Sequence, residues 1–409
     1  MSVIRRGLLS DYFDGAAVKR LSAVESNPDV SNQHEFNGSG ALRRLFGDGD
    51  RRNIVTRFVW IGDEQEAISE EGLISWYDAR RQHPTRTEYR LYYPTNPITA
   101  LMKEGDIFFV ALRPDGTAIV IVTPADGTIQ NQLMWLFGLD AQPDLRFVAR
   151  DITPDDGAEL DFAARYILDE LGVELQEPEA DMLDRLIEPF GLEFPTTRIL
   201  SALARNSLPD ANPLENPDAV LLAWMEREEQ LFRRLERRVV DVKLRSGFMA
   251  GSDADVEGFL AFSLSVQNRR KARAGQALEN HLEALFVARK LRFARGAETE
   301  NRNRPDFLFP GQAEYRDPTF PAESLTMLGA KSTLKDRWRQ VLSEAQRIDI
   351  KHLLTLEPGI STNQTDEMRT KKLQLVVPLK LHETYRESQR SWLLSLSDFV
   401  KLVGLKQGQ

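Results

Sequence analysis

Residues 305–344 contain an acid, a lysine and a second acid whose spacing suits metal-dependent chemistry. Asp306 stands at the head of one apolar run and Lys331 follows another, so both are expected at the ends of neighbouring strands. Glu344 follows on a predicted helix, where apolar residues recur at helical spacing. Carboxylate oxygens can hold a divalent metal while a lysine steadies an attacking water. The pattern therefore indicates hydrolysis of phosphodiesters, although surface charges flanking an ordinary strand and helix would give the same spacing.

The composition excludes several other kinds of site. The 409 residues include no cysteine, so thiolate nucleophiles, disulfides and cysteine-ligated zinc are excluded, and a reducing, cytoplasmic location is expected. The five histidines are scattered and form no HExxH motif. No stretch approaches the roughly 20 apolar residues of a membrane span, so no membrane partner is expected. The net charge of -9 still allows local positive patches, which are where phosphates bind.

The first 148 residues are predicted to be rich in strands. Runs of β-branched and aromatic residues predict strands over 54–61, 89–93, 107–112 and 118–123. The turn sequence between the last two runs predicts a hairpin. Short helices are expected over 41–46 and 130–139. The expected architecture is a small barrel or sandwich with covering helices.

Two predicted loops in this segment mix basic, amide, histidine and acidic side chains, the types that contact phosphates and base edges. The first loop carries Lys19, Arg20, His34 and Asn37, and the second carries Arg81, Arg86, Glu88 and Arg90. We take these eight residues as candidate DNA-binding residues. Solvated polar loops without a ligand are the competing interpretation.

Acids and prolines become frequent after residue 149, and a domain boundary is predicted near Glu177. Residues 1–177 are predicted as a first domain with a helical end, 178–217 as a linker and 218–409 as a second domain. The second domain is predicted to contain helices over 219–242 and 391–403 and strands over 352–356 and 373–377. Strands that alternate with helices are typical of an α/β domain.

Basic residues cluster where a further helix is predicted to start, at Arg269, Arg270, Lys271 and Arg273. Positive charge at the start of a helix opposes the helix dipole, so an anionic partner such as a DNA backbone is expected to compensate. On the same helix Glu279 and Glu283 are four residues apart and share a face. Glu279 is expected to point towards Asp306, and a solvated helix carboxylate is the alternative.

Taken together, these motifs resemble the EcoRII-like type II (IIE) restriction endonucleases. The resemblance is carried by NRRKARAGQALENHLEALF, RPDFLFPG and KSTLKDRWRQVLSEA, and more weakly by VKRLSA and TRTEYR in the first segment. It implies an N-terminal β-rich DNA-binding pseudobarrel and a C-terminal α/β restriction-endonuclease-like domain of the PD-(D/E)xK class. It also implies a Mg2+-dependent homodimer that cuts double-stranded DNA at a short CC/GG-containing site, CCWGG- or CCNGG-like, with a cognate DNA methyltransferase as system partner without a stable complex.

The resemblance also implies roles for individual residues. Asp306 matches the metal-binding aspartate, Lys331 the catalytic lysine, Glu344 a glutamate that has moved to the following helix, and Glu279 a further active-site glutamate. The family's base-reading cluster is matched by Lys335, Asp336 and Arg337. In such a cluster a basic residue donates to guanine and an aspartate accepts from cytosine.

The same resemblance implies that the first domain is an effector domain, which binds a second DNA copy or blocks the cleft. An extra stretch over 248–256 separates the long helix from the basic cluster. Two alternatives remain open. One is a DNA-binding regulator with an inactive nuclease domain, and the other is a nuclease that acts in repair or on modified DNA.

Overall fold

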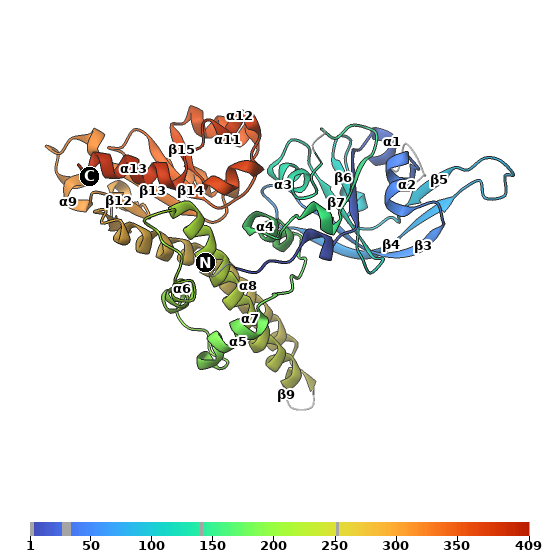
Figure 1. Cartoon of the computed structure of the whole chain (residues 1–409), viewed down its shortest axis with the longest axis horizontal. Coiled ribbons are helices and arrows are strands. Elements are labelled where there is room, and N and C mark those ends of the chain that lie inside the picture. Colours follow the sequence, from blue (N-terminus) through green and yellow to red (C-terminus); the bar gives the residue numbers. More distant parts are fainter. Residues whose placement is uncertain (1–3, 27–33, 140–141, 251–252, 409) are drawn as a thin grey trace.

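The computed structural model describes residues 4–26, 34–139, 142–250 and 253–408. Figure 1 shows an N-terminal β-sheet on one side of the molecule, a C-terminal α/β part on the other, and long helices that project below them. In the described part of the chain, no helix is long and apolar enough to cross a membrane.

The N-terminal part is built on one eight-stranded sheet. Its strands are β1 (Gly15–Arg20), β2 (Glu35–Asn37), β3 (Arg51–Trp60), β4 (Ile68–Asp78), β5 (Tyr89–Tyr92), β6 (Ile107–Leu112), β7 (Ala118–Thr123) and β8 (Val148–Asp151). They run in the order β2-β5-β4-β3-β7-β6-β1-β8, with β3 and β7 parallel and the other neighbours antiparallel. The accompanying helices are α1 (Ala23–Ser26), α2 (Gly40–Phe46), α3 (Thr128–Leu136) and α4 (Phe162–Glu170).

Both faces of this sheet are covered by apolar side chains. Every residue of β6 and β7 is buried. Phe109 and Ile121 pack with α3 and α4 on one face, whereas Phe108 and Val120 pack with α2 on the other. Strands that are buried on both faces appear in a sequence as continuous apolar runs. This explains why β6 and β7 could be predicted, and the predicted hairpin between them is confirmed.

Part of the first predicted loop is wrong, because Lys19 and Arg20 end β1 and Asn37 ends β2. The β1 sequence GAAVKR is short and its small residues give little strand signal. β1 forms a strand because it lies between β6 and β8, and the backbone of each neighbour hydrogen-bonds to it. The second loop is confirmed over residues 79–88, between β4 and β5, but Arg90, predicted in this loop, lies in β5.

The C-terminal part contains a five-stranded mixed sheet in the order β11-β12-β13-β14-β15. Its strands are β11 (Ala294–Arg295), β12 (Phe307–Phe309), β13 (Thr326–Lys331), β14 (Lys351–Thr355) and β15 (Leu373–Val376). The first three are antiparallel to one another, whereas β13, β14 and β15 are parallel. The predicted α/β class of this part is therefore confirmed.

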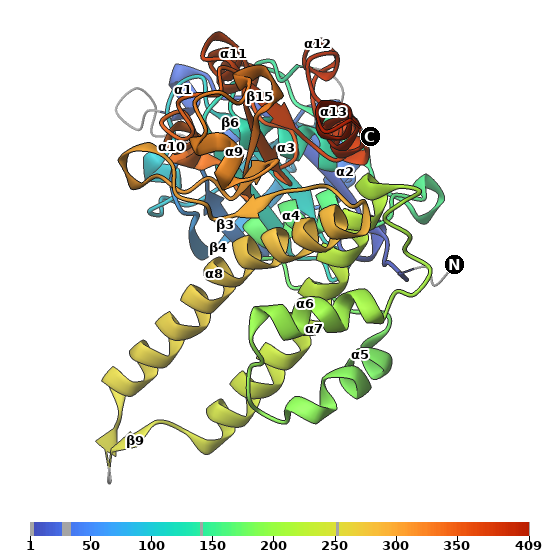
Figure 2. The same cartoon turned by 90° about the vertical axis from the view of Figure 1, so that its left-hand side faces the viewer.

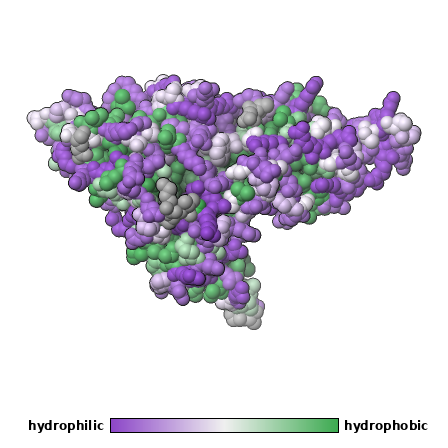
Figure 3. All heavy atoms as spheres, in the orientation of Figure 1, coloured by the Kyte–Doolittle hydropathy of each residue, from purple (hydrophilic) through white to green (hydrophobic). Residues whose placement is uncertain are grey.

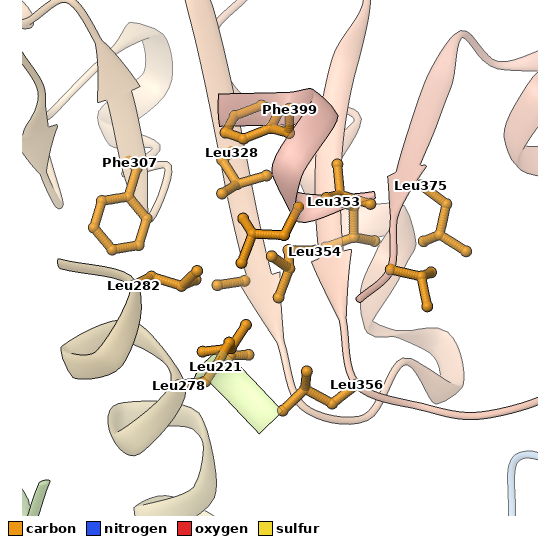
Figure 4. Close-up of a cluster of buried hydrophobic side chains, with 14 of the residues drawn as sticks. Leu221, Leu278, Leu282, Phe307, Leu328, Leu353, Leu354, Leu356, Leu375 and Phe399 are labelled. Carbon is orange, nitrogen blue, oxygen red and sulfur yellow. The ribbon is translucent and has the colours of Figure 1, made fainter. Parts of the chain in front are cut away.

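Helices of the C-terminal half pack on this sheet and on one another. They are α5 (Ala180–Ile187), α6 (Thr197–Asn206), α7 (Pro217–Ser246), α8 (Val256–Ala288), α9 (Gln312–Arg316), α10 (Trp338–Val341), α11 (Thr362–Thr370), α12 (Glu387–Arg390) and α13 (Leu396–Lys406). Figure 4 shows Leu278 and Leu282 of α8 and Leu221 of α7 meeting the sheet side chains Leu328 and Leu354. Residues 178–217, predicted as a linker, include α5 and α6, which pack against α7 in a separate apolar cluster.

The basic cluster lies in the middle of α8, not at its start as predicted. The helix begins at Val256, where the side chain of Asp255 accepts a hydrogen bond from the backbone N–H of Gly258 at 2.9 Å. No proline occurs between residues 256 and 288, so nothing in the backbone interrupts the helix. The expected clash with a helix dipole therefore does not arise at residues 269–273.

The predicted helix after Lys331 is also shorter than expected. It ends at Val341, and Glu344 lies in the turn that follows. Ala345 has a φ of 48°, which no right-handed helix can accommodate, so the chain leaves the helical path there. Trp338, Val341 and Ala345 are still buried, because a tight turn can direct the same apolar side chains inwards. Apolar spacing alone could not distinguish the two conformations.

Gly329 in β13 allows close packing beneath the predicted site. A Cβ at this position would lie 3.1 Å from Val341 Cγ2 and 3.3 Å from Leu353 Cδ1. We expect Gly329→Val to lower the free energy of unfolding by about 1–3 kcal/mol, because the added atoms overpack a closed core. Urea denaturation measures the loss. Gly275→Ala in α8 is the control: its Cβ meets nothing within 4 Å, so an equal loss there would contradict the packing argument.

Candidate active site

Asp306 and Lys331 are brought together by the antiparallel pairing of β12 and β13. Asp306 directly precedes β12, and Lys331 ends β13. The ammonium of Lys331 donates to Asp306 Oδ2 at 2.9 Å, and the backbone N–H of Ala330 donates to the same oxygen at 2.7 Å. The side chain of Asp306 is 16% exposed and that of Lys331 is 24% exposed. The predicted meeting of the acid and the lysine at strand ends is thus observed.

Glu344 is carried by a turn that is held from several directions. Asn303 donates to the carbonyl of Ser343 at 2.9 Å, just before Glu344. The backbone N–H of Gln346 donates to Glu300 Oε2 at 3.2 Å, just after it. The hydroxyl of Tyr315 in turn donates to Glu300 at 2.6 Å. These contacts fix the turn that replaces the predicted helix.

The carboxyl group of Glu344 is buried against another acid. Its Oε2 atom has no hydrogen-bond partner within the described structure. Burial and the nearby carboxylate of Asp306 raise its pKa to about 7, against smaller opposing effects of Lys331 and Lys351. Two carboxylates in a partly buried space repel each other, so this site gains stability from any added positive charge.

Glu279 approaches the same space from α8. Burial raises its pKa, Asp306 raises it further, and Arg295 lowers it. The guanidinium of Arg295 donates to Glu279 Oε2 at 2.9 Å and to Glu283 Oε2 at 2.6 Å. Glu279 therefore lies close enough to Asp306 for that acid to raise its pKa, and it is held by Arg295.

These residues fit a divalent cation. The orphaned oxygen of Glu344 and its elevated pKa indicate that this acid lies near Asp306 without a paired cation, whereas Glu279 is paired with Arg295. Hard oxygen donors of this kind suit Mg2+ or Ca2+. Among the described residues no three acidic or histidine side chains already form a complete set of metal ligands. Asp306 and Glu344 would supply protein ligands, and water or phosphate oxygens would complete the set.

The segment after Lys331 is attached to the next strand end. Lys335 and Arg337 lie in a short 3-10 turn, and the side chain of Asp336 is outside the described residues. The backbone N–H of Leu334 donates to the carboxylate of Glu357, which follows β14. Burial raises the pKa of Glu357 to about 7, and the acids Glu170 and Asp63 add to this rise.

The four basic candidates on α8 have different surroundings. Arg273 is 6% exposed and pairs with Glu229, and the side chain of Arg270 donates to Glu236 at 2.6 Å. The guanidinium of Arg269 lies 4.1 Å from the ring centre of Phe194. Lys271 is 61% exposed and pairs with Glu66 of the N-terminal part. Intramolecular acids therefore supply the counter-charge that DNA was expected to supply.

The N-terminal candidates also divide into buried and exposed residues. Lys19 is 4% exposed, pairs with Glu25 and lies 5.2 Å from the ring centre of Phe36. Arg20 lies 3.9 Å from Asp126 in a weak surface pair. Lys19 is thus held in the sheet, whereas Arg20 reaches the surface.

The other N-terminal candidates gather along one edge of the sheet. Pairing of β2 with β5 places Asn37 opposite Arg90, and Arg90 pairs with Glu88. His34, just before β2, has its Nε2 3.0 Å from Thr95 Oγ1. Exposed side chains in this region include Asn37, Arg81 and Arg86. The two predicted loops are therefore neighbours in space.

Sequence reasoning missed Arg295, Glu300 and Tyr315, which support the acids. Arg295 lies in the two-residue strand β11, and its partner in β12 is Phe307, next to Asp306. A two-residue strand gives almost no periodic signal. Glu300 and Tyr315 act only through contacts that are distant in sequence. The feature of the sequence that could have indicated these residues is the high proportion of charged side chains between 295 and 304.

Glu344→Gln is expected to raise the thermal midpoint of the metal-free protein at pH 8 and to change it little at pH 4.5. The folded-state pKa of about 7 lies above the ordinary value of 4.5. Stability linked to this carboxyl is therefore complete below about pH 4.5 and is lost as the pH rises through 7. Glutamine cannot ionise and avoids that loss. Thermal unfolding in a chelator at both pH values measures the effect.

Adding a divalent cation supplies the control for that experiment. The cation should stabilise the wild type at pH 8 more than the Glu344→Gln variant, because binding to the folded state raises its stability. If the thermal midpoint of the Glu344→Gln variant exceeded that of the wild type by the same amount at pH 8 and at pH 4.5, ionisation of Glu344 would not be the cause.

Comparison with known proteins places this chain in a family. The family model described as EcoRII C terminal matches residues 232–400. The type II restriction enzyme EcoRII of Escherichia coli is 34% identical over 420 residues, covering 99% of this chain and 98% of that enzyme. The type II restriction enzyme SsoII of Shigella sonnei is 24% identical over 239 residues, covering 53% of this chain and 76% of that enzyme. A solved complex of the restriction endonuclease PspGI with substrate DNA covers 53% of this chain and 95% of that chain, with a TM-score of 0.43 and 15% identity. On the strength of the full-length match, this chain belongs to the EcoRII family of type II restriction enzymes, which cleave DNA at specific sites.

Proposed function

We propose that Asp306, Lys331, Glu344 and Glu279 form the active site of a Mg2+-dependent endonuclease. The observation that carries this proposal is the buried, unpartnered carboxylate oxygen of Glu344 near Asp306. When bound, Mg2+ would polarise the scissile phosphate and lower the pKa of a water. A buried pair of acids has little structural value by itself, because their repulsion destabilises the metal-free fold.

Lys331 would orient the attacking water or stabilise the charge that develops on the phosphate. Its ammonium is fixed 2.9 Å from Asp306 Oδ2 and is still 24% exposed, so it can reach a bound phosphate. The N–H of Ala330 holds the same oxygen and keeps Asp306 from rotating. Glu279 would act as a positioning residue, since Arg295 ties it to the neighbouring Glu283.

Base reading would come from the turn that follows Lys331. Lys335 and Arg337 can donate to guanine, and Asp336 can accept from cytosine, which suits a CC/GG-containing site such as CCWGG or CCNGG. Their place between Lys331 and Glu344 in the sequence would couple recognition to cutting. Of the basic residues on α8, Arg269, Arg270 and Lys271 are exposed and could contact phosphates. Arg273 is buried and would hold α8 against α7 through Glu229.

Asp306→Asn and Lys331→Met are expected to reduce cleavage by on the order of a thousandfold or more. Specific binding of duplex DNA should persist, because neither change alters the base-reading turn. The measurement uses plasmids carrying CCNGG, CCWGG or CCGG sites, methylated and unmethylated, incubated with Mg2+. Wild-type protein should give discrete fragments from one of these sets, and gel shifts should report binding by the variants.

The matched control replaces an acid and a lysine that pair just before β14 and β15, at the strand ends opposite to the end that carries Lys331. Lys372→Met and Asp349→Asn remove an exposed pair at 2.9 Å and should leave cleavage unchanged. If Asp306→Asn cut DNA at the wild-type rate, the assigned catalytic residues would be wrong. If the wild type gave no fragments from any plasmid, the proposed recognition site would be wrong.

Residues 1–177 would form an effector domain with a pseudobarrel fold, and 218–409 would form the nuclease domain. Support comes from the eight-stranded sheet with apolar clusters on both faces. The edge where Asn37 faces Arg90, next to the loop that carries Arg81 and Arg86, offers both amide and guanidinium groups to DNA. A second, effector copy of DNA would bind there.

The same N-terminal domain would restrain the nuclease through acids that stand where phosphates would otherwise lie. Glu66 pairs with Lys271, which together with Lys335 lowers the pKa of Glu66. Lys335 also lowers the raised pKa of Glu170 in α4. Two basic residues of the nuclease thus face acids of the N-terminal part, and both would have to exchange these partners to bind DNA.

Glu66→Gln is expected to increase cleavage of single-site DNA several-fold, because Lys271 loses its competing acid. Cleavage time courses at low salt measure the change, since exposed ion pairs are weakened by salt. Glu71→Gln is the matched control: it is also exposed, but it lies on β4 and should leave the rate unchanged. Equal rates for wild type and Glu66→Gln would argue against this restraint.

Such an enzyme would work as a homodimer, because cutting both strands of a symmetric site requires two active sites. It would act in the cytoplasm beside a cognate DNA methyltransferase that protects the host's own sites. The alternative of a DNA-binding regulator is disfavoured because the acid, the lysine and Glu344 are all present and close together. A repair nuclease would use the same chemistry, and the plasmid experiment separates it by the absence of site-specific fragments.

A further inference from the structure

Glu357 is a buried acid close to the strand end that carries Lys331. Strands β13 and β14 are parallel, and their pairing places Lys331 opposite Thr355, two residues before Glu357. The face of the molecule drawn in Figure 3 is mostly hydrophilic, because charged side chains usually lie at the surface. Glu357, in contrast, is only 8% exposed. A charged group in such a place needs hydrogen-bond donors within the protein.

The carboxylate of Glu357 holds the residue that precedes the base-reading turn, residues 335–337. It accepts a hydrogen bond from the backbone N–H of Leu334. The side chain of Leu334 is buried in the C-terminal core, and its carbonyl accepts from the backbone N–H of Arg337 at 2.7 Å. Leu334 is therefore fixed through its side chain, its carbonyl and its N–H, and the bond to Glu357 ties the start of the turn to the end of β14.

The turn begins in a conformation that other parts of the structure must hold. Lys335 has a φ of 33°, in the left-handed region that residues other than glycine rarely adopt. Such a conformation persists only where surrounding contacts impose it. The bond to Glu357 lies one residue before Lys335, and the buried side chain of Trp338 directly follows Arg337. Lys335 and Arg337 thus lie between two fixed points.

Glu357 is itself held firmly within the C-terminal part. Its backbone N–H donates to Thr355 Oγ1 at 3.1 Å, and the hydroxyl of Tyr385 donates to its carbonyl at 2.7 Å. Both of these partners are buried. Because all three residues belong to the nuclease part, the bond between Glu357 and Leu334 does not need contacts with the N-terminal part to set its position.

We propose that Glu357 is a positioning residue for base reading, which fixes Leu334 and thereby the direction from which Lys335 and Arg337 meet DNA. This role rests on the proposed function of the turn, and it adds the residue that sets the position of that turn. Paired hydrogen bonds to guanine depend on the angle at which a side chain enters the groove. A turn that could shift would therefore lose discrimination between bases.

The charges around Glu357 favour this role over a purely structural one. Burial raises its pKa to about 7, and the acids Glu170 and Asp63 add to this rise. The hydrogen bond from Leu334 and the charge of Lys335 act in the opposite direction. A buried acid beside two other acids destabilises the fold, so stability alone does not account for a carboxyl here. An ionised acceptor, however, forms a hydrogen bond about twice as strong as a neutral one and so holds Leu334 more firmly.

The positioning role is tested on the full chain by gel shifts. One duplex carries the site that the wild type cuts, and the second differs from it by one base pair in the CC/GG part. Glu357→Ala should reduce the ratio of the two dissociation constants by on the order of tenfold or more, because a hydrogen bond to a charged group is lost. Glu357→Gln keeps the shape and a neutral acceptor, and it should lose less, about severalfold. An unchanged ratio in either variant would overturn the proposal.

Asp218→Ala and Asp218→Asn are the matched controls, because Asp218 is another buried acid that accepts hydrogen bonds from backbone N–H groups. Its carboxylate accepts from Leu379 at 3.0 Å and from Leu396 and Ser397 at 2.9 Å. None of these residues belongs to the base-reading turn. Both controls should lower stability in urea and leave the ratio of dissociation constants unchanged. A loss of discrimination equal to that of the Glu357 variants would mean that general destabilisation is the cause, and the positioning role would be wrong.

A double-mutant cycle with Arg337 tests the route through which Glu357 acts. Arg337→Ala alone should lower discrimination, because it removes a donor to guanine. If Glu357 acts by positioning the turn, the combined loss in Glu357→Gln with Arg337→Ala should be smaller than the product of the two single losses. A combined loss equal to that product would contradict the proposal, since independent effects multiply.

The same measurements separate this role from the function on which it rests. If Arg337→Ala left discrimination unchanged, the proposed base-reading function of the turn would be wrong. If Arg337→Ala lost discrimination and Glu357→Gln did not, the positioning role of Glu357 alone would be wrong. Gel shifts do not depend on cleavage, so the assignment of Asp306 and Lys331 stands or falls separately.

Discussion

The repulsion between Asp306 and Glu344 is the constraint on which much of the C-terminal part depends. A pKa of about 7 for Glu344 means that the metal-free fold holds this carboxyl at a cost. The turn that carries Glu344 is accordingly anchored on both sides, through Asn303 before it and Glu300 after it. Without these contacts the acid could swing to solvent and relieve the repulsion. The anchoring network thus maintains a strained arrangement of charge that a cation can relax.

The sequence predicts this arrangement only in part, and the reason differs from element to element. Strands such as β6 and β13 were predictable because burial on both faces gives continuous apolar runs. The conformation around Glu344 was not, because a helix and a tight turn bury the same apolar residues and only the φ of Ala345 separates them. The role of Arg295 was not predictable either. It binds Glu279, which is sixteen residues away in the sequence, and the pairing of β11 with β12 sets its position.

Polar contacts join the N-terminal part to the nuclease part, beside the apolar contacts that Ile4 and Ala163 make with the C-terminal core. Gln132 in α3 donates to the carbonyl of Pro358 at 2.9 Å, and the backbone N–H of Ser361 donates to Thr128 at 3.1 Å. Arg386 adds a bond to Asn131 at 3.0 Å. Polar interfaces between domains resemble transient protein contacts more than cores. In the proposed function, such a surface would hold one arrangement of the two parts and release it when DNA competes for Lys271 and Lys335.

Helix α8 connects three parts of the molecule. Its first half projects away from both sheets (Figure 2), its middle carries the basic residues, and its second half contributes Leu278 to the core and Glu279 to the candidate site. At about 1.5 Å per residue, its 33 residues span roughly 50 Å as one uninterrupted helix. A contact that moves the first half of α8 therefore also moves the basic residues and Glu279. The extra stretch over 248–256 thus ends where α8 begins, and the same helix carries both the basic cluster and Glu279.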